Sequence, residues 1–140
     1  MRSMTLKLKP QGELKTGLTH VAVKIGDLDS NDLYDAEFLV DTGAIDSMAP
    51  ASELRRVGIK PVGKRAYELA SGELQEYEYG LAKLRFMGEL TSTDIIFGPE
   101  NTEPILGVIA LEGAGFIVDS KNQTLRKLKA RPLKQAAFAK

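Results

Sequence analysis

The sequence contains no cysteine and a single histidine, His20. Without cysteine, the chain has no disulfide framework, no thiolate nucleophile and no cysteine-based metal site. One histidine also excludes a histidine-rich metal site, and a Ser–His–Asp triad would depend on His20 alone. Because His20 falls in a predicted strand over residues 19–25, a histidine held by its neighbours in a sheet is the simpler interpretation.

An excess of charge of either sign is also missing, because 19 basic residues face 19 acidic ones. This balance gives no reason to expect a nucleic acid, a membrane surface or a strongly acidic partner. Six basic residues gather without any acid in residues 126–140, namely Arg126, Lys127, Lys129, Arg131, Lys134 and Lys140. We interpret this segment as a solvated tail, which is the ordinary role of a short basic end.

Long hydrophobic runs are absent as well. Residues 1–12 are polar and basic without the apolar stretch of a signal peptide, and no later segment approaches the length of a membrane span. We therefore expect a cytoplasmic chain with no membrane partner. With 140 residues, 43% of them hydrophobic and 27% charged, the composition is that of one soluble globular domain with a substantial core.

What is present is mostly β-type pattern. Residues 19–25 and a second run ending at Asp41 are joined by the polar connector 26–35, and together they predict a β-hairpin. Residues 65–97 alternate in polarity and are interrupted by turn residues at 70–73 and 87–89, which predicts a meander of two successive hairpins. Residues 115–119 and 124–128 predict a last hairpin.

Helical signals are few and short. Pro50 precedes residues 51–56 and Gly58 follows them, which is the arrangement expected of a short helix or a single turn. Gly107 interrupts the apolar run 105–112, so we expect a short buried strand up to Leu106 and a short helix over residues 108–112.

The most informative stretch is residues 38–44, Phe-Leu-Val-Asp-Thr-Gly-Ala, in which an apolar run ends on an acid. Three strand-forming residues favour a buried environment, whereas Asp41 is costly to bury unless its carboxylate is hydrogen-bonded or neutralised. Gly43 permits a sharp turn, and Thr42 supplies a hydroxyl that can donate and accept. The stretch therefore predicts an acid held in a tight loop at the end of a core strand.

Two other interpretations of Asp41 stay open on these residues. The stretch could be only a strand that runs into an Asp-Gly-type turn. Asp41 could also be a phosphoaspartyl nucleophile at a strand end, but that chemistry would need magnesium and alternating strands and helices. The chain is mostly strands, which makes the second interpretation the weakest.

The order of these segments resembles that of the retropepsin-like aspartic proteases. The segments are the strand and loop at 38–44, a hairpin with a small-residue tip at 70–72, the Ile-Leu-Gly of 105–107 and a closing hairpin. These are single-lobe relatives of the retroviral proteases that are found also in bacteria. The resemblance covers about residues 19–128. It implies an all-β, closed-barrel domain over residues 1–140 with one or two short helices, a core at about 19–128 and a basic C-terminal tail at 129–140.

The resemblance also implies roles for single residues. Asp41 corresponds to the catalytic acid. The active-site loop continues through Thr42, whose hydroxyl would knit two such loops together, and through Gly43 and Ala44. Substrate binding is implied for Asp46 and for the hairpin tip, which would close over the substrate, at Ala70, Ser71 and Gly72. Packing behind the catalytic loop is implied for Ile105, Leu106 and Gly107.

The implied activity is that of an aspartic endopeptidase acting on peptides or unfolded protein. That chemistry requires two carboxylates that share one proton. The sequence has one Asp-Thr-Gly and is too short for two lobes, so the simplest solution is a two-fold symmetric homodimer in which two copies of Asp41 meet. Neither a metal nor an organic cofactor is required. The alternative is a non-catalytic peptide-binding or protein-binding module on the same fold.

Overall fold

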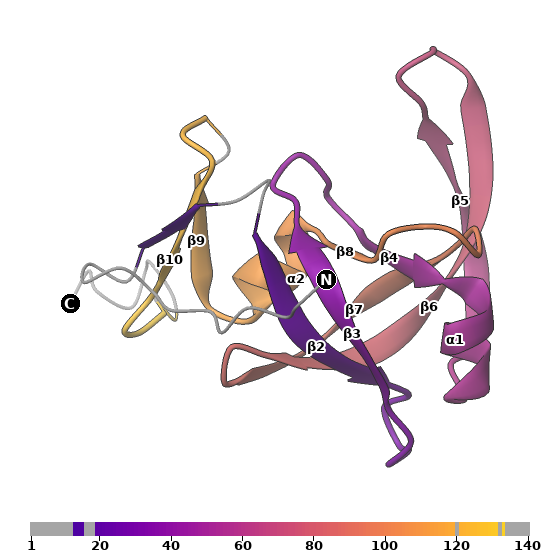
Figure 1. Cartoon of the computed structure of the whole chain (residues 1–140), viewed down its shortest axis with the longest axis horizontal. Helices are drawn as coiled ribbons and strands as arrows, with labels where there is room; N and C mark the ends of the chain where they lie inside the picture. The colour runs from indigo at the N-terminus through magenta and orange to yellow at the C-terminus, as the bar shows by residue number, and fades with distance from the viewer. Residues whose placement is uncertain (1–12, 16–18, 120, 132, 134–140) are drawn as a thin grey trace.

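The structure is a computed structural model that describes residues 13–15, 19–119, 121–131 and 133 (Figure 1). The polar segment 1–12 and most of the basic tail lie outside the described residues. In chain order the elements are β1 (Glu13–Lys15), β2 (His20–Gly26), β3 (Tyr34–Val40), β4 (Ser47–Pro50), α1 (Ala51–Arg56), β5 (Pro61–Glu68), β6 (Leu74–Phe86), β7 (Glu89–Gly98), β8 (Ile105–Leu106), α2 (Val108–Gly113), β9 (Phe116–Asp119) and β10 (Thr124–Lys127).

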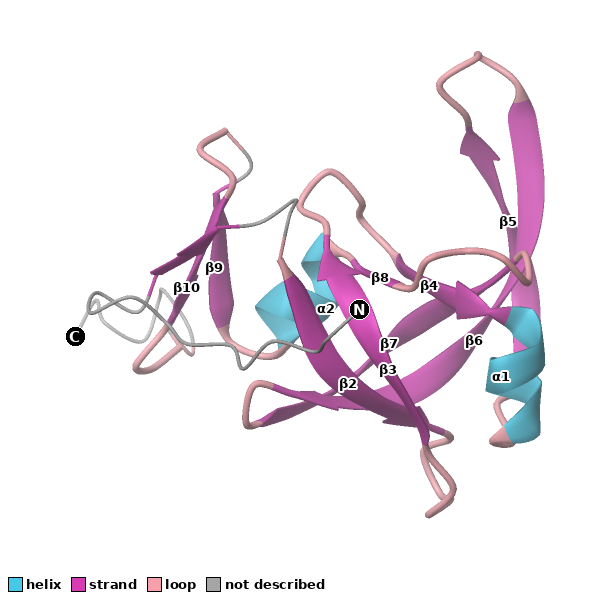
Figure 2. Ribbon diagram, in the orientation of Figure 1, coloured by secondary structure: helices cyan, strands magenta, loops and turns pink. Residues whose placement is uncertain are grey.

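Among the described residues, six strands close into a barrel. The sheet runs in the order β2-β3-β8-β4-β7-β6-β5, and β2 also pairs with β6, so that the first six strands form a ring and β5 lies outside it. Figure 2 shows strands throughout the part that is described, and the helices α1 and α2 have six residues each. The expected all-β closed barrel and the predicted hairpin and meander are therefore confirmed.

The barrel forms because alternate residues of its strands are apolar and point inward. In β2 the residues Val21, Val23 and Ile25 are buried, and the facing strand β3 contributes Phe38 and Val40. Each fully buried side chain of this size stabilises the fold by about 1.5–3 kcal/mol. The larger core also includes Leu54 of α1 and Leu111 of α2, which explains why two helices of six residues each are stable: packing holds them rather than helix propensity.

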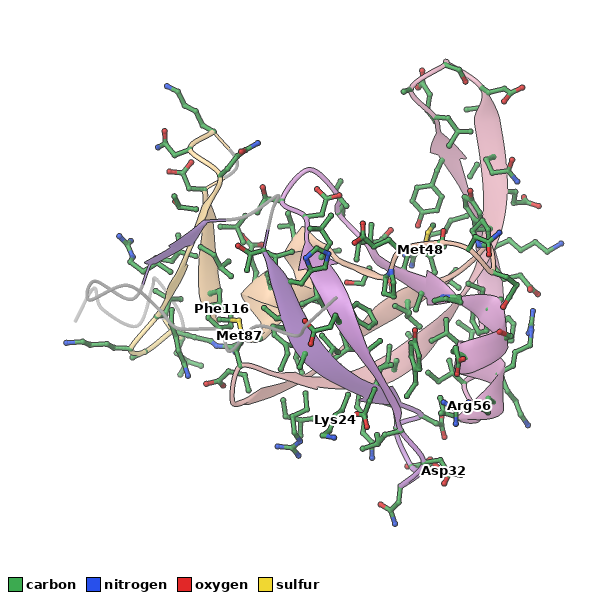
Figure 3. All side chains as sticks on the ribbon, in the orientation of Figure 1. Lys24, Asp32, Met48, Arg56, Met87 and Phe116 are labelled. Atoms are coloured by element: carbon green, nitrogen blue, oxygen red, sulfur yellow. The ribbon has the colours of Figure 1, made fainter. Side chains whose placement is uncertain are left out.

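A second, smaller sheet in the order β1-β10-β9 lies beside the barrel. Phe116 of β9 stacks on Phe86 at the end of β6, with ring centroids 6.3 Å apart (Figure 3). The closing hairpin predicted from the sequence is thus present as β9 and β10. The strand β1, which pairs with β10, was not anticipated.

The hairpin of β5 and β6 extends beyond the barrel (Figure 1). Residues 74–80 of β6 pair with β5, whereas residues 79–86 pair with β7, so among the described residues the outer part of the hairpin has only two strands. The strand β5 begins at Pro61, whereas the sequence predicted a start at residue 65. Proline has no N–H, but it is tolerated here because the first residue of an edge strand need not donate to a ladder. The tip lies at residues 69–73, as expected.

The strand β4 was not predicted as a strand. It pairs in parallel with β7 and meets β8 at Met48, opposite Ile105. The side chain of Met48, labelled in Figure 3, packs against Gly98 of β7. A Cβ added to Gly98 would lie only 2.7 Å from it. Since both neighbours of β4 come from residues about fifty positions away in the sequence, its four residues carry no local pattern that could reveal them.

The short strand β8 runs between β3 and β4, parallel to β3 and antiparallel to β4. This position forces the chain at Gly107 against the backbone that leads into β4. A Cβ on Gly107 would lie 2.6 Å from the carbonyl oxygens of both Ile45 and Asp46. A glycine is therefore required here by contact with backbone, which cannot rotate away as a side chain can.

We predict that Gly107→Ala lowers the free energy of unfolding by about 3 kcal/mol, at the upper end of overpacking effects. Urea unfolding measures this directly. The matched control is Gly113→Ala at the end of α2, where the nearest atom to an added Cβ is the side-chain hydroxyl of Thr91 at 2.7 Å. That hydroxyl can rotate, so the control should lose less than about 1 kcal/mol. Equal losses in the two variants would contradict the backbone clash.

Candidate active site

Asp41 follows β3 directly and opens the loop 41–46 that leads into β4. Its side chain is partly buried, and the backbone N–H of Gly43 donates to Asp41 Oδ1 at 2.9 Å. The N–H of Ala44 donates to the carbonyl of Asp41 at 3.2 Å and closes the turn. The structure thus places the carboxylate in a tight loop at the end of a core strand, as the sequence predicts.

The loop is joined by backbone hydrogen bonds to β8 and α2. The N–H of Asp41 donates to the carbonyl of Leu106 at 3.0 Å, and the N–H groups of Val108 and Ile109 donate to the carbonyls of Ala44 and Ile45 at 2.8 and 3.1 Å. The first N–H groups of a helix have no partner inside the helix, and α2 has no side-chain cap. The loop carbonyls take that place, so residues 105–107 and the loop are brought together as expected.

Two hydroxyl side chains are buried in this region. Ser47 is 1% exposed, and its Oγ accepts a hydrogen bond from the N–H of Gly107 at 2.9 Å. Thr42, beside Asp41, is 9% exposed. Ser47 was missed in the sequence, although a serine between Asp46 and the apolar residues of β4 is a signal of a buried hydrogen bond.

On the side of the loop that faces the hairpin, Asp46 belongs to a cluster of polar side chains. Asp46 Oδ2 accepts a hydrogen bond from the Tyr67 hydroxyl at 2.6 Å and lies 3.5 Å from Arg65 Nη1. Arg65 Nη2 lies 2.6 Å from Oδ2 of Asp94 on β7. We call Asp46, Arg65, Tyr67 and Asp94 the hairpin–loop cluster. It connects the candidate catalytic loop with β5 and β7.

Within the hairpin, Arg65 also contacts Tyr79 of β6. The Arg65 guanidinium carbon lies 3.8 Å from the ring centroid of Tyr79, a distance at which a cation and an aromatic ring attract each other. The ring of Tyr79 has room because residue 63 is a glycine, and a Cβ at that position would lie 2.8 Å from the ring. Of this arrangement the sequence analysis anticipated only Asp46, since the rest depends on the register of β5 and β6.

The cluster keeps both of its donors protonated. The hydrogen bond to Asp94 is the main cause that raises the pKa of Arg65 above its usual range. Burial, followed by the hydrogen bond to Asp46, raises the pKa of Tyr67 to about 12. Both residues therefore donate to carboxylates at any pH near neutrality.

The predicted hairpin tip, Ala70, Ser71 and Gly72, is exposed at the far end of β5 and β6. The N–H of Gly72 donates to the carbonyl of Leu69 at 2.8 Å, and Gly72 has φ +88° with no atom within 4 Å of an added Cβ. This backbone conformation suits glycine and leaves open space around the tip. Figure 1 shows the tip and the loop between β3 and β4 on the same side of the view.

His20 lies in β2 and contacts Glu103 with 2.6 Å between Nε2 and Oε2, which agrees with a strand histidine that has a polar partner. Among the residues that the structure describes, no group of three or more His, Cys, Asp and Glu side chains is placed to hold a metal ion. None of the described helices is long and apolar enough to cross a membrane.

The raised pKa of Tyr67 predicts a pH dependence of stability. Because the neutral phenol is favoured in the folded state, its contribution is complete below pH 10, the ordinary pKa, and is lost as the pH rises toward about 12. Tyr67→Phe removes the ionisable hydroxyl, so the free energy of unfolding of this variant should fall less steeply with pH than that of the wild type. Over this pH range the wild type should lose about 1–2 kcal/mol more than the variant, after allowance for the partial exposure of Tyr67. Urea unfolding at several pH values measures the slopes. Identical slopes would show that the hydroxyl makes no such contribution.

Comparison with known proteins agrees with the geometry. The family model described as Aspartyl protease matches residues 21–110, which is more than half of the chain. This range begins in β2 and ends in α2, so that it includes Asp41, the hairpin of β5 and β6, and β8. No curated protein matches the chain closely enough to be counted as a relative. On its sequence and its fold, the chain belongs to the aspartyl protease family.

Proposed function

We propose that the chain is an aspartic endopeptidase that hydrolyses peptide bonds in peptides or unfolded proteins and that acts as a homodimer. The observation that carries this proposal is the position of Asp41. Its carboxylate stands at the end of a buried strand, in a loop that is held by backbone hydrogen bonds on both sides of the acid. A carboxylate fixed in this way meets the main requirement of acid–base catalysis, which is a proton acceptor or donor in a constant place.

The reaction uses two carboxylates with one proton between them. The ionised carboxylate takes a proton from water while the water oxygen attacks the carbonyl carbon of the peptide bond, and the protonated carboxylic acid donates its proton to the carbonyl oxygen. The tetrahedral intermediate then breaks its carbon–nitrogen bond. The leaving nitrogen takes the proton of the carboxylic acid formed in the first step, and one hydroxyl of the intermediate returns its proton to the other carboxylate, which restores the pair with one shared proton. Because two carboxylates so close together cannot both ionise, they titrate as a pair.

The second carboxylate comes from a second copy of the chain. Asp41 is the one acid that the sequence places in an Asp-Thr-Gly loop, and a two-fold axis beside this loop brings two copies of Asp41 together. In this arrangement Gly43 orients the acid through its N–H, Ala44 anchors the loop on α2, and the buried Thr42 connects the two loops. Ile105, Leu106 and Gly107 support the loop from behind.

The hairpin of β5 and β6 is the lid of this site. In the part of the chain that the structure describes, its outer part has two strands only, and hairpins without a third strand have little stability of their own. The exposed tip at Ala70, Ser71 and Gly72 can therefore approach a peptide that lies against the loop. Asp46, at the end of the loop nearest to the hairpin, binds the peptide from the other side.

The remaining expectations from the sequence complete the proposal. The chain is one domain with its core at about residues 19–128 and a basic tail at 129–140, and it requires no cofactor or metal. A cytoplasmic location and the absence of nucleic acid and membrane partners also remain predictions. A non-catalytic peptide-binding module on the same fold is the alternative, and it is the better account if the chain binds peptides that it does not cleave.

We predict that Asp41→Asn reduces the cleavage of fluorogenic unstructured peptides at least 100-fold, because acid–base catalysis contributes about 10²–10⁴ to a rate. The fold should persist, since little packing changes. The matched control is Asp35→Asn on β3, the strand that precedes Asp41. Asp35 is an exposed acid that pairs with Lys24 at 3.0 Å, and this variant should cleave at the wild-type rate. If Asp41→Asn keeps more than a few per cent of the activity, Asp41 is not the catalytic acid.

A further inference from the structure

The outer part of the β5–β6 hairpin needs an anchor that its own strands do not provide. Residues 61–68 of β5 pair with β6 alone and have no partner strand on their other side among the described residues. A two-stranded hairpin of this kind is marginally stable in water. Its orientation relative to the barrel must therefore be set by side chains that reach from the hairpin to the barrel and to the loop 41–46.

The hairpin–loop cluster is in the right place to do this. Arg65 and Tyr67 lie two residues apart on β5, so their side chains leave the same face of the strand. Tyr67 reaches Asp46 of the candidate catalytic loop at 2.6 Å, and Arg65 lies 2.6 Å from Asp94 of β7 and 3.5 Å from Asp46. Three parts of the molecule that lie far apart in the sequence are thus connected through two side chains of one strand.

We propose that Arg65 is a positioning residue that fixes the resting orientation of the β5–β6 hairpin relative to the loop that holds Asp41. This inference rests on the proposed function, because it makes the hairpin a lid whose starting position matters. The loop is fixed from behind by its backbone bonds to β8 and α2. Asp46 is at its other end, so a hairpin attached to Asp46 is held relative to Asp41 as well.

The burial of the cluster distinguishes it from the other charge pairs of the hairpin. The side chains of Asp46, Asp94 and Arg65 are 12%, 28% and 34% exposed, whereas those of Lys64 and Glu76, which lie 4.0 Å apart on the outer face, are 64% and 63% exposed. Exposed pairs contribute little, but removing the cation from a partly buried group leaves its anions unpaired. Without Arg65, the carboxylates of Asp46 and Asp94 would lose the positive charge that they share.

The geometry also explains why arginine suits this position. Arg65 contacts two carboxylates through two different nitrogens, Nη1 and Nη2, while its guanidinium plane covers the ring of Tyr79. A lysine ammonium is a single point of charge and cannot make the same pair of contacts while stacked on a ring. Arg65→Lys should therefore restore only part of what Arg65→Met loses.

The kinetic consequence follows from the fraction of molecules whose hairpin is ready to close. If that fraction falls, the apparent affinity for the peptide falls in proportion, whereas the reaction of the bound peptide is unchanged. For Arg65→Met we expect KM to rise about 10-fold with kcat within about 2-fold of the wild type, and for Arg65→Lys we expect an intermediate KM. Asp94→Asn, which leaves the loop and the hairpin intact, should raise KM in the same direction, and adding it to Arg65→Met should have little further effect.

The test has a second arm that does not depend on activity, namely hydrogen exchange of backbone amides in the protein without substrate. We expect amides of residues 65–77 to exchange at least about 5-fold faster in Arg65→Met and in Asp94→Asn than in the wild type, while amides of β2 and β3 are unchanged. The control Lys64→Met removes a neighbouring charge from the opposite face and should change neither exchange nor KM.

The two arms separate the inference from the function on which it rests. If the wild type cleaves no peptide, the proposed function fails, and the exchange arm still decides whether Arg65 holds the hairpin. Unchanged exchange at residues 65–77 in Arg65→Met would overturn the positioning role. Equal acceleration in β2 and β3 would overturn it too, because Arg65 would then act on the stability of the whole fold. A fall in kcat at constant KM would show that Arg65 acts on the chemical step instead.

Discussion

The structure depends on the backbone hydrogen bonds between the loop 41–46 and the segment 106–109. The backbone N–H of Asp41 donates to the carbonyl of Leu106, and the first N–H groups of α2 donate to the carbonyls of Ala44 and Ile45. These bonds satisfy groups at a helix terminus and in a partly buried loop that would otherwise be costly to leave unpaired. They also determine the position of β8 between β3 and β4, the need for glycine at 107, and the place where the loop that begins at Asp41 leaves the barrel.

The same loop is held from its opposite end by side chains. Asp46 joins it to β5 through Tyr67 and Arg65, and Asp94 extends the contact to β7. The loop therefore has one rigid side, made of backbone bonds, and one side that is attached to a two-stranded hairpin. In the function that we propose, this arrangement keeps the acid in place while the hairpin moves to admit a peptide.

The sequence predicts those features whose causes are local. The apolar run that ends at Asp41, the glycine that breaks the run 105–112 and the turn residues at 70–73 each indicate their own structure, and all three lie where they were expected. It does not predict β4, because this strand is defined by β7 and β8, which come much later in the chain. The roles of Arg65, Tyr67 and Asp94 depend on strand register for the same reason, since alternation alone suggests only that residues 65 and 67 share a face.

The central claim is that one active site needs Asp41 from two chains, so that assembly and activity are the same event. The most direct test is a series of initial cleavage rates over a wide range of protein concentration, with sedimentation measured on the same samples. If the dimer alone is active, the rate varies with the square of protein concentration below the dissociation constant of the dimer and linearly above it. Rates that remain proportional to total protein, over a range in which sedimentation shows dimers giving way to monomers, would contradict the shared site.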